Sequence, residues 1–480
     1  MSKSKNQEGL SVKKEEDFSE WYNQVCLKAG LAEYSTVKGC MVIKPLGYSI
    51  WENIQKNFNK IIKSMGVRNA YFPLFIPESF FKKEATHAEG FTPEVAWLDK
   101  EVTGGEEKLA VRPTSETIMY DSYSRWIRSH RDLPLRINQW CNVVRWETKA
   151  TRLFLRSREF LWQEGHCVYA TADECVKETI EYAKRYKKFI EEFLGIPILI
   201  GAKTDKEKFS GAETTYSVEA IMPDSKALQA GTSHDLGNNF AKAFGIQFED
   251  KDKKLKYPFQ NSWGISTRLI GALVMTHADD KGLVIPPKIA DEKIVVVPIR
   301  FEQDKKVLVK SREIVKRLSK YNPILDERLE VTPGYKFNEW ELKGVPVRIE
   351  IGPKDLEKKE CILFFRDSLE KKVVKIKDLE KVVSQELIFM QKRMFEKAKK
   401  VLESKLDTAE SLEELNKKIK QGKIVLVPLE NSKEVEDILK DKLEGVKTLN
   451  RPFKQPNLIN KKCIISGKSA AYWVYVGRSY

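Results

Sequence analysis

The sequence predicts a multidomain protein of mixed class, with an α+β domain first, an α/β domain after it and a small α+β domain last. Its 480 residues give room for roughly three domains of about 150 residues each. Short strand-like runs dominate from 109 to 222, whereas strand-like and helix-like segments alternate beyond Pro286 and Pro287. This change of pattern predicts a domain boundary at the two prolines.

The charge composition permits a polyanionic partner but does not select one. Lys and Arg total 84 against 69 Asp and Glu, a formal charge of +15, and 41% of the residues are hydrophobic. That hydrophobic fraction is sufficient for globular domains. The basic excess favours nucleic acid, although a lysine-rich proteome produces the same excess without such a partner.

Cysteine and histidine usage argues against a disulfide framework and against a local zinc motif. The seven cysteines are scattered without a Cys-x-x-Cys pair, and the five histidines are also spread out. No apolar run reaches the ~18 residues needed to span a bilayer, and residues 1–16 are polar and lack the apolar core of a signal peptide. We therefore expect a cytoplasmic protein without a membrane segment and with a flexible tail over 1–16.

Local patterns predict the elements of the first domain. Residues 46–65 carry apolar side chains at helical spacing between Pro45 and Gly66, which are start and stop signals. A strand-like run follows at 69–76, and Pro73 within it predicts an edge strand or an interface. Similar patterns predict a helix at 174–194, a half-buried strand at 214–221 and a helix at 266–277.

The remainder of the chain alternates between strands and helices. Strands are predicted at 293–299, 345–351 and 361–365, with helices at 304–321 and 379–406. The last segment starts with a charged helix from about 408, continues with a strand at 424–427 and ends in an aromatic tail at 472–480.

Three stretches carry chemistry, and the first is Arg-Pro-Thr-Ser-Glu at 112–116. A hydroxyl and a carboxylate two residues apart can meet one small cation if the backbone is extended or looped. Thr114 then offers its oxygen and Glu116 its charge. Taken alone, the stretch also fits an ordinary helix N-terminus.

The second stretch begins with Arg145-Trp146-Glu147. On a strand, Arg145 and Glu147 would share one face, so that Arg145 could grip a carboxylate or phosphate bidentately while Glu147 accepts from an exocyclic amine. A surface ion-pair ladder explains one such pair. It does not explain the density of arginine, aromatic and acidic residues that follows, namely Arg156, Arg158, Phe160, Trp162, Glu164 and His166.

The third stretch is Trp-Gly-Ile-Ser-Thr-Arg at 263–268. It places Arg268 near a predicted helix start, where an arginine can lie beside a phosphate. An ordinary arginine on a helix surface is the simpler alternative.

Together the three stretches resemble motifs of the class II aminoacyl-tRNA synthetases, and the prolyl-tRNA synthetase family in particular. The resemblance runs from about Leu10 to the last residue. Besides the stretches above it includes Phe72-Pro73, Glu84, His87-Ala88-Glu89-Gly90-Phe91, Trp162-Gln163-Glu164-Gly165-His166, Gly231-Thr232-Ser233-His234 and Gly477-Arg478-Ser479-Tyr480.

The resemblance implies a domain for each predicted unit. An antiparallel-sheet catalytic domain occupies 17–287, an α/β anticodon-binding domain 291–398 and a small α+β C-terminal domain 405–480. Related C-terminal domains often hold zinc on four cysteines, but this one has only Cys463, so we expect no zinc and no other metal bound by protein ligands alone. Mg²⁺ is expected with ATP, and a homodimer is expected from the family and from Pro73.

The resemblance also implies the partners, ATP, L-proline and tRNA(Pro), and the residues that bind the first two. ATP is expected at Arg145, Glu147, Arg156, Phe160, Gln229, Thr232 and Arg268, with Phe160 stacked on adenine. Proline is expected at Thr114, Glu116, Arg145, Trp162, Glu164, His166, Ser233 and His234. In the implied reaction the proline carboxylate attacks the α-phosphate in line, and a terminal ribose hydroxyl of the tRNA then takes the prolyl group. Arg145, Arg268 and Mg²⁺ are expected to stabilise charge without an enzyme nucleophile.

Anticodon recognition is expected in the Arg-Ile-Glu-Ile-Gly-Pro-Lys stretch at 348–354. Single-stranded bases can be splayed out and read at their edges, which suits Arg348, Glu350 and Lys354. A solvated strand face is the alternative interpretation of the same pattern.

Two departures and two rivals narrow the hypothesis. Besides the missing cysteines, the residues between His166 and Arg268 leave no room for the large editing insertion of many bacterial relatives, so we expect no cis-editing and some entry of alanine. A threonyl or seryl enzyme is one rival, but a threonyl enzyme would need zinc ligands in its pocket and a seryl enzyme a long coiled-coil arm, and the sequence shows neither. An inactive tRNA-binding paralogue is the other, although such proteins usually lose the ATP arginines that Arg145 and Arg268 represent here.

Overall fold

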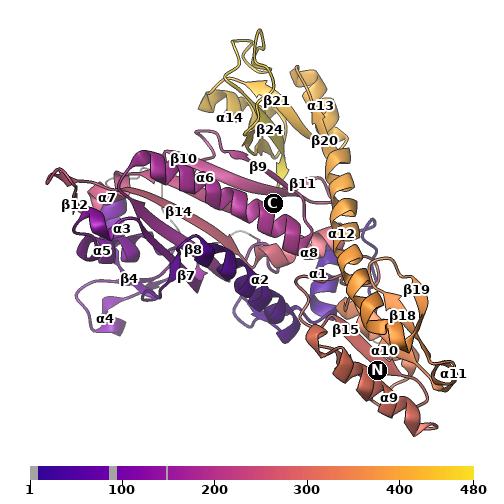
Figure 1. The fold of residues 1–480 in the computed structure, drawn as a ribbon. Helices are drawn as coiled ribbons and strands as arrows, with labels where there is room; N and C mark the ends of the chain where they lie inside the picture. The colour runs from indigo at the N-terminus through magenta and orange to yellow at the C-terminus, as the bar shows by residue number, and fades with distance from the viewer. Residues whose placement is uncertain (1–8, 86–93, 148–149) are drawn as a thin grey trace.

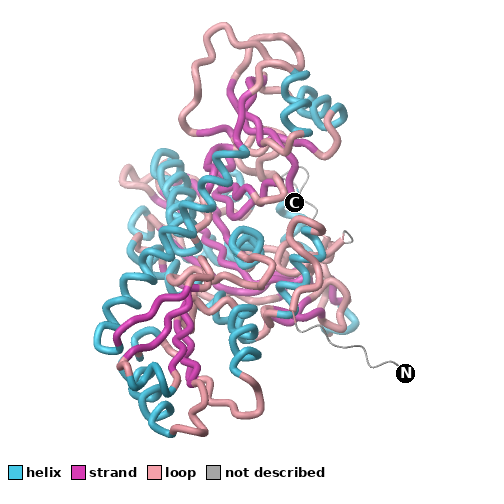
Figure 2. The backbone as a smooth tube through the Cα atoms, turned by 90° about the vertical axis from the view of Figure 1, so that its right-hand side faces the viewer, coloured by secondary structure: helices cyan, strands magenta, loops and turns pink. Residues whose placement is uncertain are grey.

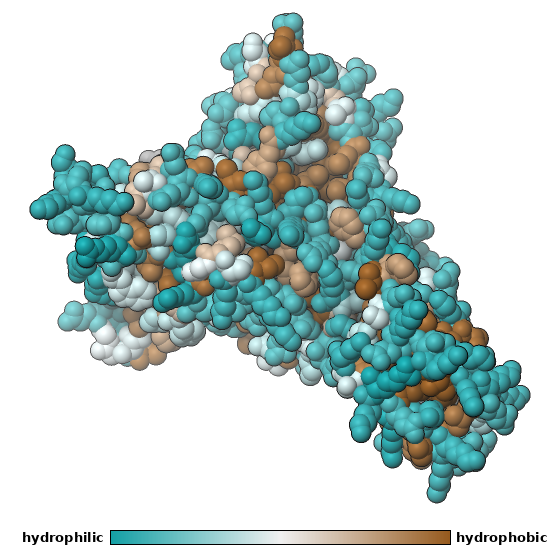
Figure 3. Space-filling model, in the orientation of Figure 1, coloured by the Kyte–Doolittle hydropathy of each residue, from teal (hydrophilic) through white to brown (hydrophobic). Residues whose placement is uncertain are grey.

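A computed structural model describes residues 9–85, 94–147 and 150–480. Figure 1 shows a central strand-rich body, a lower domain and an upper domain. One long helix, α12 (Leu379–Lys405), runs from the lower domain to the upper domain. The motif residues His87–Phe91 and the first half of the expected tail, 1–8, lie outside the described residues. The face shown in Figure 3 is mostly hydrophilic, in keeping with the high charged fraction of 32%.

The central body is built on an antiparallel sheet, as expected from the resemblance. Strands β7, β8, β14, β11 and β10 pair antiparallel in that order, and β9 extends the sheet beyond β10. The bounds are β7 Leu135–Val144, β8 Glu159–Tyr169, β9 Ile198–Ala202, β10 Thr214–Ile221, β11 Lys226–Gly237 and β14 Phe259–Ser266.

Helices cover one face of this sheet. Helix α6 (Ala172–Phe189), which continues as the π-helical turn η2 (Ile190–Leu194), lies across the strands in Figure 1. The ring of Tyr182 stacks on Trp263 at 4.0 Å, and Tyr186 stacks on Phe58 of α2 (Pro45–Ser64) at 5.1 Å. Helices α1 (Phe18–Lys28) and α8 (Arg268–His277) complete this core. The opposite face of β7, β8, β11 and β14 is therefore the one that can hold a cavity.

The predicted strand at 69–76 is two strands that belong to different sheets. β3 (Arg68–Asn69) pairs parallel with β7, whereas β4 (Phe75–Pro77) pairs with β6 (Leu109–Val111) in a small sheet that β5 (Trp97–Leu98) completes. Pro73 lies between them and has no N–H to donate, so the ladder ends where the chain changes sheet.

One helix lies where only strands were predicted. Helix α5 (Glu116–Trp126) starts inside the Arg-Pro-Thr-Ser-Glu stretch and buries Met119, Tyr120 and Tyr123. The alternative interpretation of that stretch, a helix N-terminus, is therefore confirmed. Ser115, at the cap position, makes no side-chain cap hydrogen bond, and this leaves its hydroxyl available to the site described below.

The lower domain has the expected α/β arrangement. Its sheet has the order β16-β15-β17-β18-β19, with β15 parallel to both of its neighbours and β18 and β19 antiparallel. The strands are β15 Ile294–Pro298, β16 Ile324–Leu325, β17 Val347–Ile351, β18 Glu360–Phe365 and β19 Lys371–Lys375. The helices are α9 Lys305–Arg317, α10 Pro333–Lys343, which was not predicted, and α11 Pro353–Glu357.

The upper domain is joined to the central body by strand pairing. Helix α12 (Leu379–Lys405) leads to β20 (Leu406–Thr408), α13 (Leu412–Lys420), β21 (Ile424–Leu429), α14 (Lys433–Lys442), β22 (Val446–Thr448), β23 (Arg451–Pro452) and β24 (Tyr472–Ser479). The end of β24 runs parallel to β11 at Lys226–Arg478 and Ala227–Ser479, and β23 pairs with β9. Figure 2 shows these strands continuing from the upper domain into the central sheet. Among the helices that the structure describes, none has both the length and the apolar character needed to cross a membrane.

The described part of the expected flexible tail is hydrogen-bonded to the central body. The backbone N–H of Lys14 donates to Oδ1 of Asp280 at 2.7 Å, and its Nζ donates to the carbonyls of Met275 and Ala278, each at 2.9 Å. The ordered chain therefore starts before residue 17, the boundary expected from the sequence.

Candidate active site

A two-lobed cavity lies on the sheet face opposite α6. One lobe, of about 310 Å³, contains the acidic side chains of the Thr-x-Glu and Glu-x-His motifs, and we call it the acidic lobe. The other, of about 270 Å³, is lined by arginines and lysines, and we call it the basic lobe. The two lobes share the residues Arg145, Phe160, Gln229, Ser266 and Arg268.

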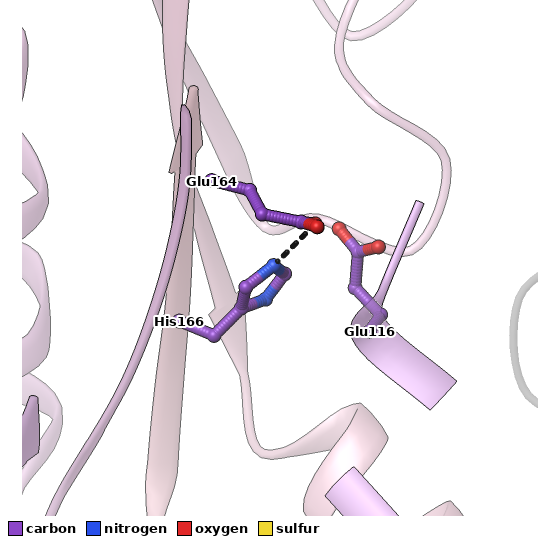
Figure 4. A group of neighbouring side chains, drawn as sticks. All are labelled: Glu116, Glu164 and His166. Atoms are coloured by element: carbon purple, nitrogen blue, oxygen red, sulfur yellow. Dashed lines mark hydrogen bonds and ion pairs between the residues drawn. The ribbon is translucent and has the colours of Figure 1, made fainter. Parts of the chain in front are cut away.

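The floor of the acidic lobe is a buried cluster of Glu116, Glu164 and His166, which face one another in Figure 4. Nε2 of His166 donates to Oε2 of Glu164 at 3.0 Å. The Thr114 hydroxyl donates to Glu116, so the hydroxyl and the carboxylate of the first motif do meet. The three side chains are only 5%, 2% and 1% exposed, respectively.

The charges of this cluster follow from its contacts. Burial raises the pKa of Glu164, but hydrogen bonds from His166, Ser115 and Gln139 and the charge of His166 outweigh it, and the pKa lies below its usual value. Burial lowers the pKa of His166, but Glu116 and Glu164 outweigh it, and the pKa lies above its usual value. Glu164 and His166 thus form an ion pair, and Glu116 adds a second carboxylate beside it.

Side chains behind the cluster fix its geometry. The Ser115 backbone N–H donates to Oε2 of Glu164 at 3.1 Å, and Nε2 of Gln139 donates to Oε1 at 3.1 Å. The Tyr120 hydroxyl lies 3.3 Å from Nδ1 of His166. These partners come from α5 and β7, so the start of the unpredicted helix α5 and the sheet together hold the carboxylate and the imidazole in place.

His234 lies at the side of the acidic lobe as a neutral imidazole. Burial, and next the charge of His166, lower its pKa to about 3. Its Nδ1 lies 2.9 Å from the Thr215 hydroxyl, and its ring lies 4.8 Å from the ring of Phe209. His166 and His234 therefore carry different charges although both belong to the predicted proline site.

Arg145 and Arg268 stand where the lobes meet. Burial lowers the pKa of both guanidinium groups, and for Arg268 the neighbouring Arg145 lowers it further. Nε of Arg145 donates to the Pro113 carbonyl at 3.1 Å, and its guanidinium lies 5.5 Å from each ring centroid of Phe160 and Trp162. Nη1 of Arg268 donates to the Gln229 carbonyl at 3.2 Å. Two cations that are desolvated and close together favour an anionic ligand between them.

The basic lobe continues this positive surface with ion pairs at its edge. Arg156 donates to Glu147 at 2.6 Å, and Lys203 lies 2.9 Å from Glu219 with both side chains buried. The guanidinium of Arg152 lies 5.8 Å from the ring of the last residue, Tyr480, which also lines the lobe.

Most of the residues predicted for the site line the cavity. Arg145 and Glu147 do so from the loop after β7, rather than from the strand itself. The predicted residues that line one or both lobes are Thr114, Glu116, Arg145, Glu147, Arg156, Phe160, Trp162, Glu164, His166, Gln229, Thr232, His234 and Arg268.

Ser233 is a correction to the prediction. Its hydroxyl donates to the Thr179 carbonyl of α6 at 2.8 Å, on the helix-covered face of the sheet. Thr232 and His234 line the cavity, and successive side chains of a strand point to opposite faces. Ser233 therefore cannot contact a ligand in the acidic lobe.

The predicted anticodon residues are also corrected in part. Arg348 lies inside the lower domain, where it donates to Glu350 at 3.0 Å and to Glu341 of α10 at 3.0 Å, and its guanidinium lies 4.2 Å from the Phe337 ring centroid. Arg348 is therefore a buried partner of α10 and Glu350 a buried partner of Arg348, and neither is free to read a base. Lys354, in the first turn of α11, is exposed.

Sequence reasoning missed several cavity residues. Glu207, Phe209 and Thr215 line the acidic lobe, and Arg152, Lys203, Glu219, Lys447 and Tyr480 line the basic lobe. Tyr480 belongs to the Gly-Arg-Ser-Tyr motif that carries the resemblance, and this was the one signal available. The others lie outside any motif and reach the cavity only through the fold.

Two groups of side chains come into question as ligands for a cation. Glu116, Glu164 and His166 have ligand atoms within 4.8 Å of one another, but Glu164 and His166 already satisfy each other. Glu219 and Gln229 are register partners on β10 and β11 and both line the basic lobe. Lys203 already contacts Oε1 of Glu219 at 2.9 Å, so Mg²⁺ here would use the other carboxylate oxygen with the Gln229 amide oxygen, and it takes few protein ligands together with substrate phosphates.

Comparison with known proteins matches all three parts of the chain. The family model described as tRNA synthetase class II core domain (G, H, P, S and T) matches 97–277. The model described as Anticodon binding domain matches 293–386, and the one described as Prolyl-tRNA synthetase, C-terminal, matches 412–480.

Curated relatives are similar over their whole length. The chain is 48% identical to a proline--tRNA ligase of Agathobacter rectalis, with 100% of both chains covered. It is 47% identical to a proline--tRNA ligase of Alkaliphilus oremlandii, with 97% of each covered. It is 45% identical to the proline--tRNA ligase 2 of Bacillus cereus, with 99% of this chain and 100% of the relative covered.

Proposed function

The chain belongs to the prolyl-tRNA synthetase family, and we propose that it activates L-proline with ATP and transfers the prolyl group to tRNA(Pro). One observation carries the proposal most directly. A buried acidic lobe that suits an amino group opens through Arg145 and Arg268 into a basic lobe that suits a triphosphate. Such a cavity can bring an amino-acid carboxylate and an α-phosphate together between two guanidinium groups.

The acidic lobe suits the secondary ammonium group of proline. Glu116 supplies the counter-charge, because Glu164 is already paired with His166. The Thr114 hydroxyl, bonded to Glu116, fixes the direction of that carboxylate. Trp162 lines the same lobe as an apolar surface on which the pyrrolidine ring can pack.

The basic lobe suits ATP. Phe160 offers a ring face for adenine, and Glu147 offers a carboxylate for its exocyclic amine. Arg145, Arg156 and Arg268 offer guanidinium groups for the phosphates. Thr232 lines only the acidic lobe, so we assign it to the amino-acid end rather than to adenine.

In the proposed reaction the proline carboxylate attacks the α-phosphate, and pyrophosphate leaves from the opposite side. Arg145 and Arg268 hold the reacting groups and stabilise the charge that develops on the phosphate, without transferring a proton. Mg²⁺, bound by Glu219 and Gln229 together with the phosphates, would neutralise charge on the leaving pyrophosphate. The tRNA ribose hydroxyl then attacks the activated carbonyl and releases AMP.

The remaining assignments rest on the family and on the chain's chemistry. The seven cysteines carry free thiols, which fits a reducing compartment, and we propose a cytoplasmic homodimer. The upper domain offers Cys463 alone of the four cysteines common in relatives, so we expect no bound zinc. We propose that the editing insertion is absent, because the residues between His166 and Arg268 form α6, strands of the catalytic sheet and short elements between them.

Amino-acid-dependent pyrophosphate exchange tests the proposal. Exchange should depend on L-proline and should fall about 100-fold or more in Arg145→Ala, because a charge-stabilising donor is lost. Arg312→Ala, which removes an exposed arginine paired with Glu327 on the lower domain, is the control and should keep normal exchange. Exchange that depends on threonine or serine would favour the rival synthetases, and no exchange with any amino acid would favour the inactive paralogue.

A further inference from the structure

The connection between β9 and β10 forms part of the acidic lobe. This segment, 203–213, contributes Glu207 and Phe209 to the lining. Within the central body, the Phe209 backbone N–H donates to the Thr215 hydroxyl at 2.9 Å and the ring contacts His234. The position of the segment therefore determines the shape of the pocket that we assign to proline.

The same segment is attached to the upper domain at four successive residues. The Thr204 hydroxyl donates to Oε2 of Glu436 at 3.0 Å, and Asn431 donates to Asp205 at 2.7 Å. Lys206 pairs with Asp437, and Lys447 lies 3.6 Å from Glu207. The partners come from the loop before α14, from α14 and from β22, so a domain more than two hundred residues later in the chain holds residues 204–207.

The contact at Thr204 is buried and polar, whereas the two contacts of Asp205 and Lys206 are exposed. The Thr204 and Thr448 hydroxyls both donate to Oε2 of Glu436, and the three residues are 1%, 1% and 5% exposed. The two hydroxyls lie 3.3 Å apart, so removing the carboxylate would leave one of them without an acceptor in a buried place, which is costly. Glu436 therefore fixes the start of the segment more firmly than the surface ion pairs do.

We propose that the upper domain sets the affinity of the catalytic site for the amino acid, with Glu436 as a positioning residue that holds residues 204–207 and through them the Glu207 and Phe209 wall of the acidic lobe. The proposal rests on the proposed function, because it names the domain that shapes the amino-acid pocket. Glu436 does not line either lobe, so it acts through the two residues that it holds, Thr204 in the segment and Thr448 in β22.

Because the cavity has two lobes, the role of Glu436 can be distinguished from a general effect of packing the upper domain against the central body. The upper domain also lines the basic lobe, with Lys447, Leu449, Ser479 and Tyr480. Undocking of the whole domain would therefore weaken ATP as well as the amino acid. Loss of the Glu436 contact alone should weaken the amino acid more than ATP, because Glu207 and Phe209 line the acidic lobe and not the basic lobe.

The experiment measures KM for proline, KM for ATP and kcat of pyrophosphate exchange in the full chain. Glu436→Ala and Thr204→Val should each raise KM for proline about tenfold, since a charge-assisted buried hydrogen bond is lost. KM for ATP and kcat should stay within about twofold of wild type. Thr204→Ser keeps the hydroxyl and should behave as wild type, and so should Lys461→Ala, which removes an exposed pair with Glu410 in the same domain.

A double-mutant cycle adds a second readout. Phe209→Ala alone should raise KM for proline, and adding Glu436→Ala should raise it by less than the product of the two single effects, because both act on one wall. Independent, multiplicative effects would overturn the proposal. Should Glu436→Ala fail to fold, Thr204→Val takes its place in the cycle.

Two further outcomes would overturn the proposal. One is an unchanged KM for proline in both anchor variants. The other is an equal rise in KM for proline and for ATP, which would show that the whole domain had undocked. Failure of the proposed function is visible separately, because the wild-type chain would then show no proline-dependent exchange, and the variants would be measured with the amino acid that it does activate.

Discussion

One charged and one neutral histidine line the acidic lobe. His166 is held charged by two carboxylates, whereas His234 is kept neutral by burial and by the charge of His166. Both histidines belong to motifs that were predicted to bind proline. Only their surroundings decide that one is part of an ion pair and that the other is an uncharged side of the pocket.

The lowered pKa of His234 predicts a pH dependence of stability. The unfolded chain binds a proton at this residue below about pH 6.5, whereas the folded chain does so only near pH 3. The stability that the neutral His234 contributes is therefore present above the ordinary pKa and is lost as the pH falls. The urea midpoint of the wild type should be lower at pH 5 than at pH 7. The midpoint of His234→Gln should fall by less over this range.

His166 should act in the opposite direction. Its pKa is raised, so its contribution is present below the ordinary value of 6.5 and is lost as the pH rises through the folded value. His166→Gln should therefore show a shallower fall of stability at high pH than the wild type. Identical pH profiles for both histidine variants and for the wild type would contradict the assigned charges.

At the scale of elements, one large ring of the catalytic sheet fits because the residue beside it has no side chain. Trp263 of β14 lies flat against β8 at Gly165 and stacks on Tyr182 of α6. A Cβ on Gly165 would lie 2.1 Å from Cε2 of Trp263. The glycine inside the Glu-Gly-His motif is thus needed for packing on one face, while Glu164 and His166 act on the other.

Gly165→Ala should therefore lower the free energy of unfolding by about 3 kcal/mol, as expected when a side chain is forced into a packed core. The matched control is Gly334→Ala near the start of α10, where an added Cβ meets nothing within 4 Å. That variant should be neutral or slightly stabilising. Urea denaturation of both variants checks the prediction, which an equal effect at the two positions would contradict.

Of the three residues expected to read the anticodon, Lys354 alone is exposed. Lys354→Glu should weaken aminoacylation of tRNA(Pro), by about tenfold if one charged contact is lost. Proline-dependent pyrophosphate exchange, which needs no tRNA, should be unchanged. Lys440→Glu, at an exposed position of α14, is the control for charge alone, and equal loss of both activities in Lys354→Glu would argue against an anticodon role.

On the scale of the whole molecule, the uninterrupted catalytic sheet predicts limited accuracy. Residues 167–267 form α6, η2 and sheet strands, together with the short helix α7 (Asn239–Ala243) and the small hairpin of β12 (Phe248–Glu249) and β13 (Leu255–Lys256), with no inserted domain among them. A pocket that discriminates by apolar contact gains only about 10- to 200-fold for each missing methylene. We expect measurable alanyl-adenylate in the presence of alanine and ATP, detected by alanine-dependent pyrophosphate exchange. Rejection of alanine beyond about 10⁵-fold would show that the isolated chain has another means of exclusion.

Local patterns predicted much of the fold, and the family resemblance implied most of the residues that line the cavity. The helix at 46–65, the strand at 214–221 and the long helix at 379–406 are confirmed because their apolar periodicity is regular. Helices α5 and α10 were missed, and the run at 69–76 was taken as one strand. In these cases the decisive contacts are with other parts of the chain, and periodicity carries no information about them.

The sequence by itself determined the chemistry of this protein: which side chains can pair with an amino group or with phosphates, and in which order they occur along the chain. The tertiary structure decided which of them meet. It turned Ser233 toward α6, buried Arg348 against α10 with Glu350 as its partner, and brought Tyr480 and the Glu436 contact to the catalytic sheet. The physical reason is that facing and burial depend on contacts between segments tens to hundreds of residues apart, which no local pattern contains.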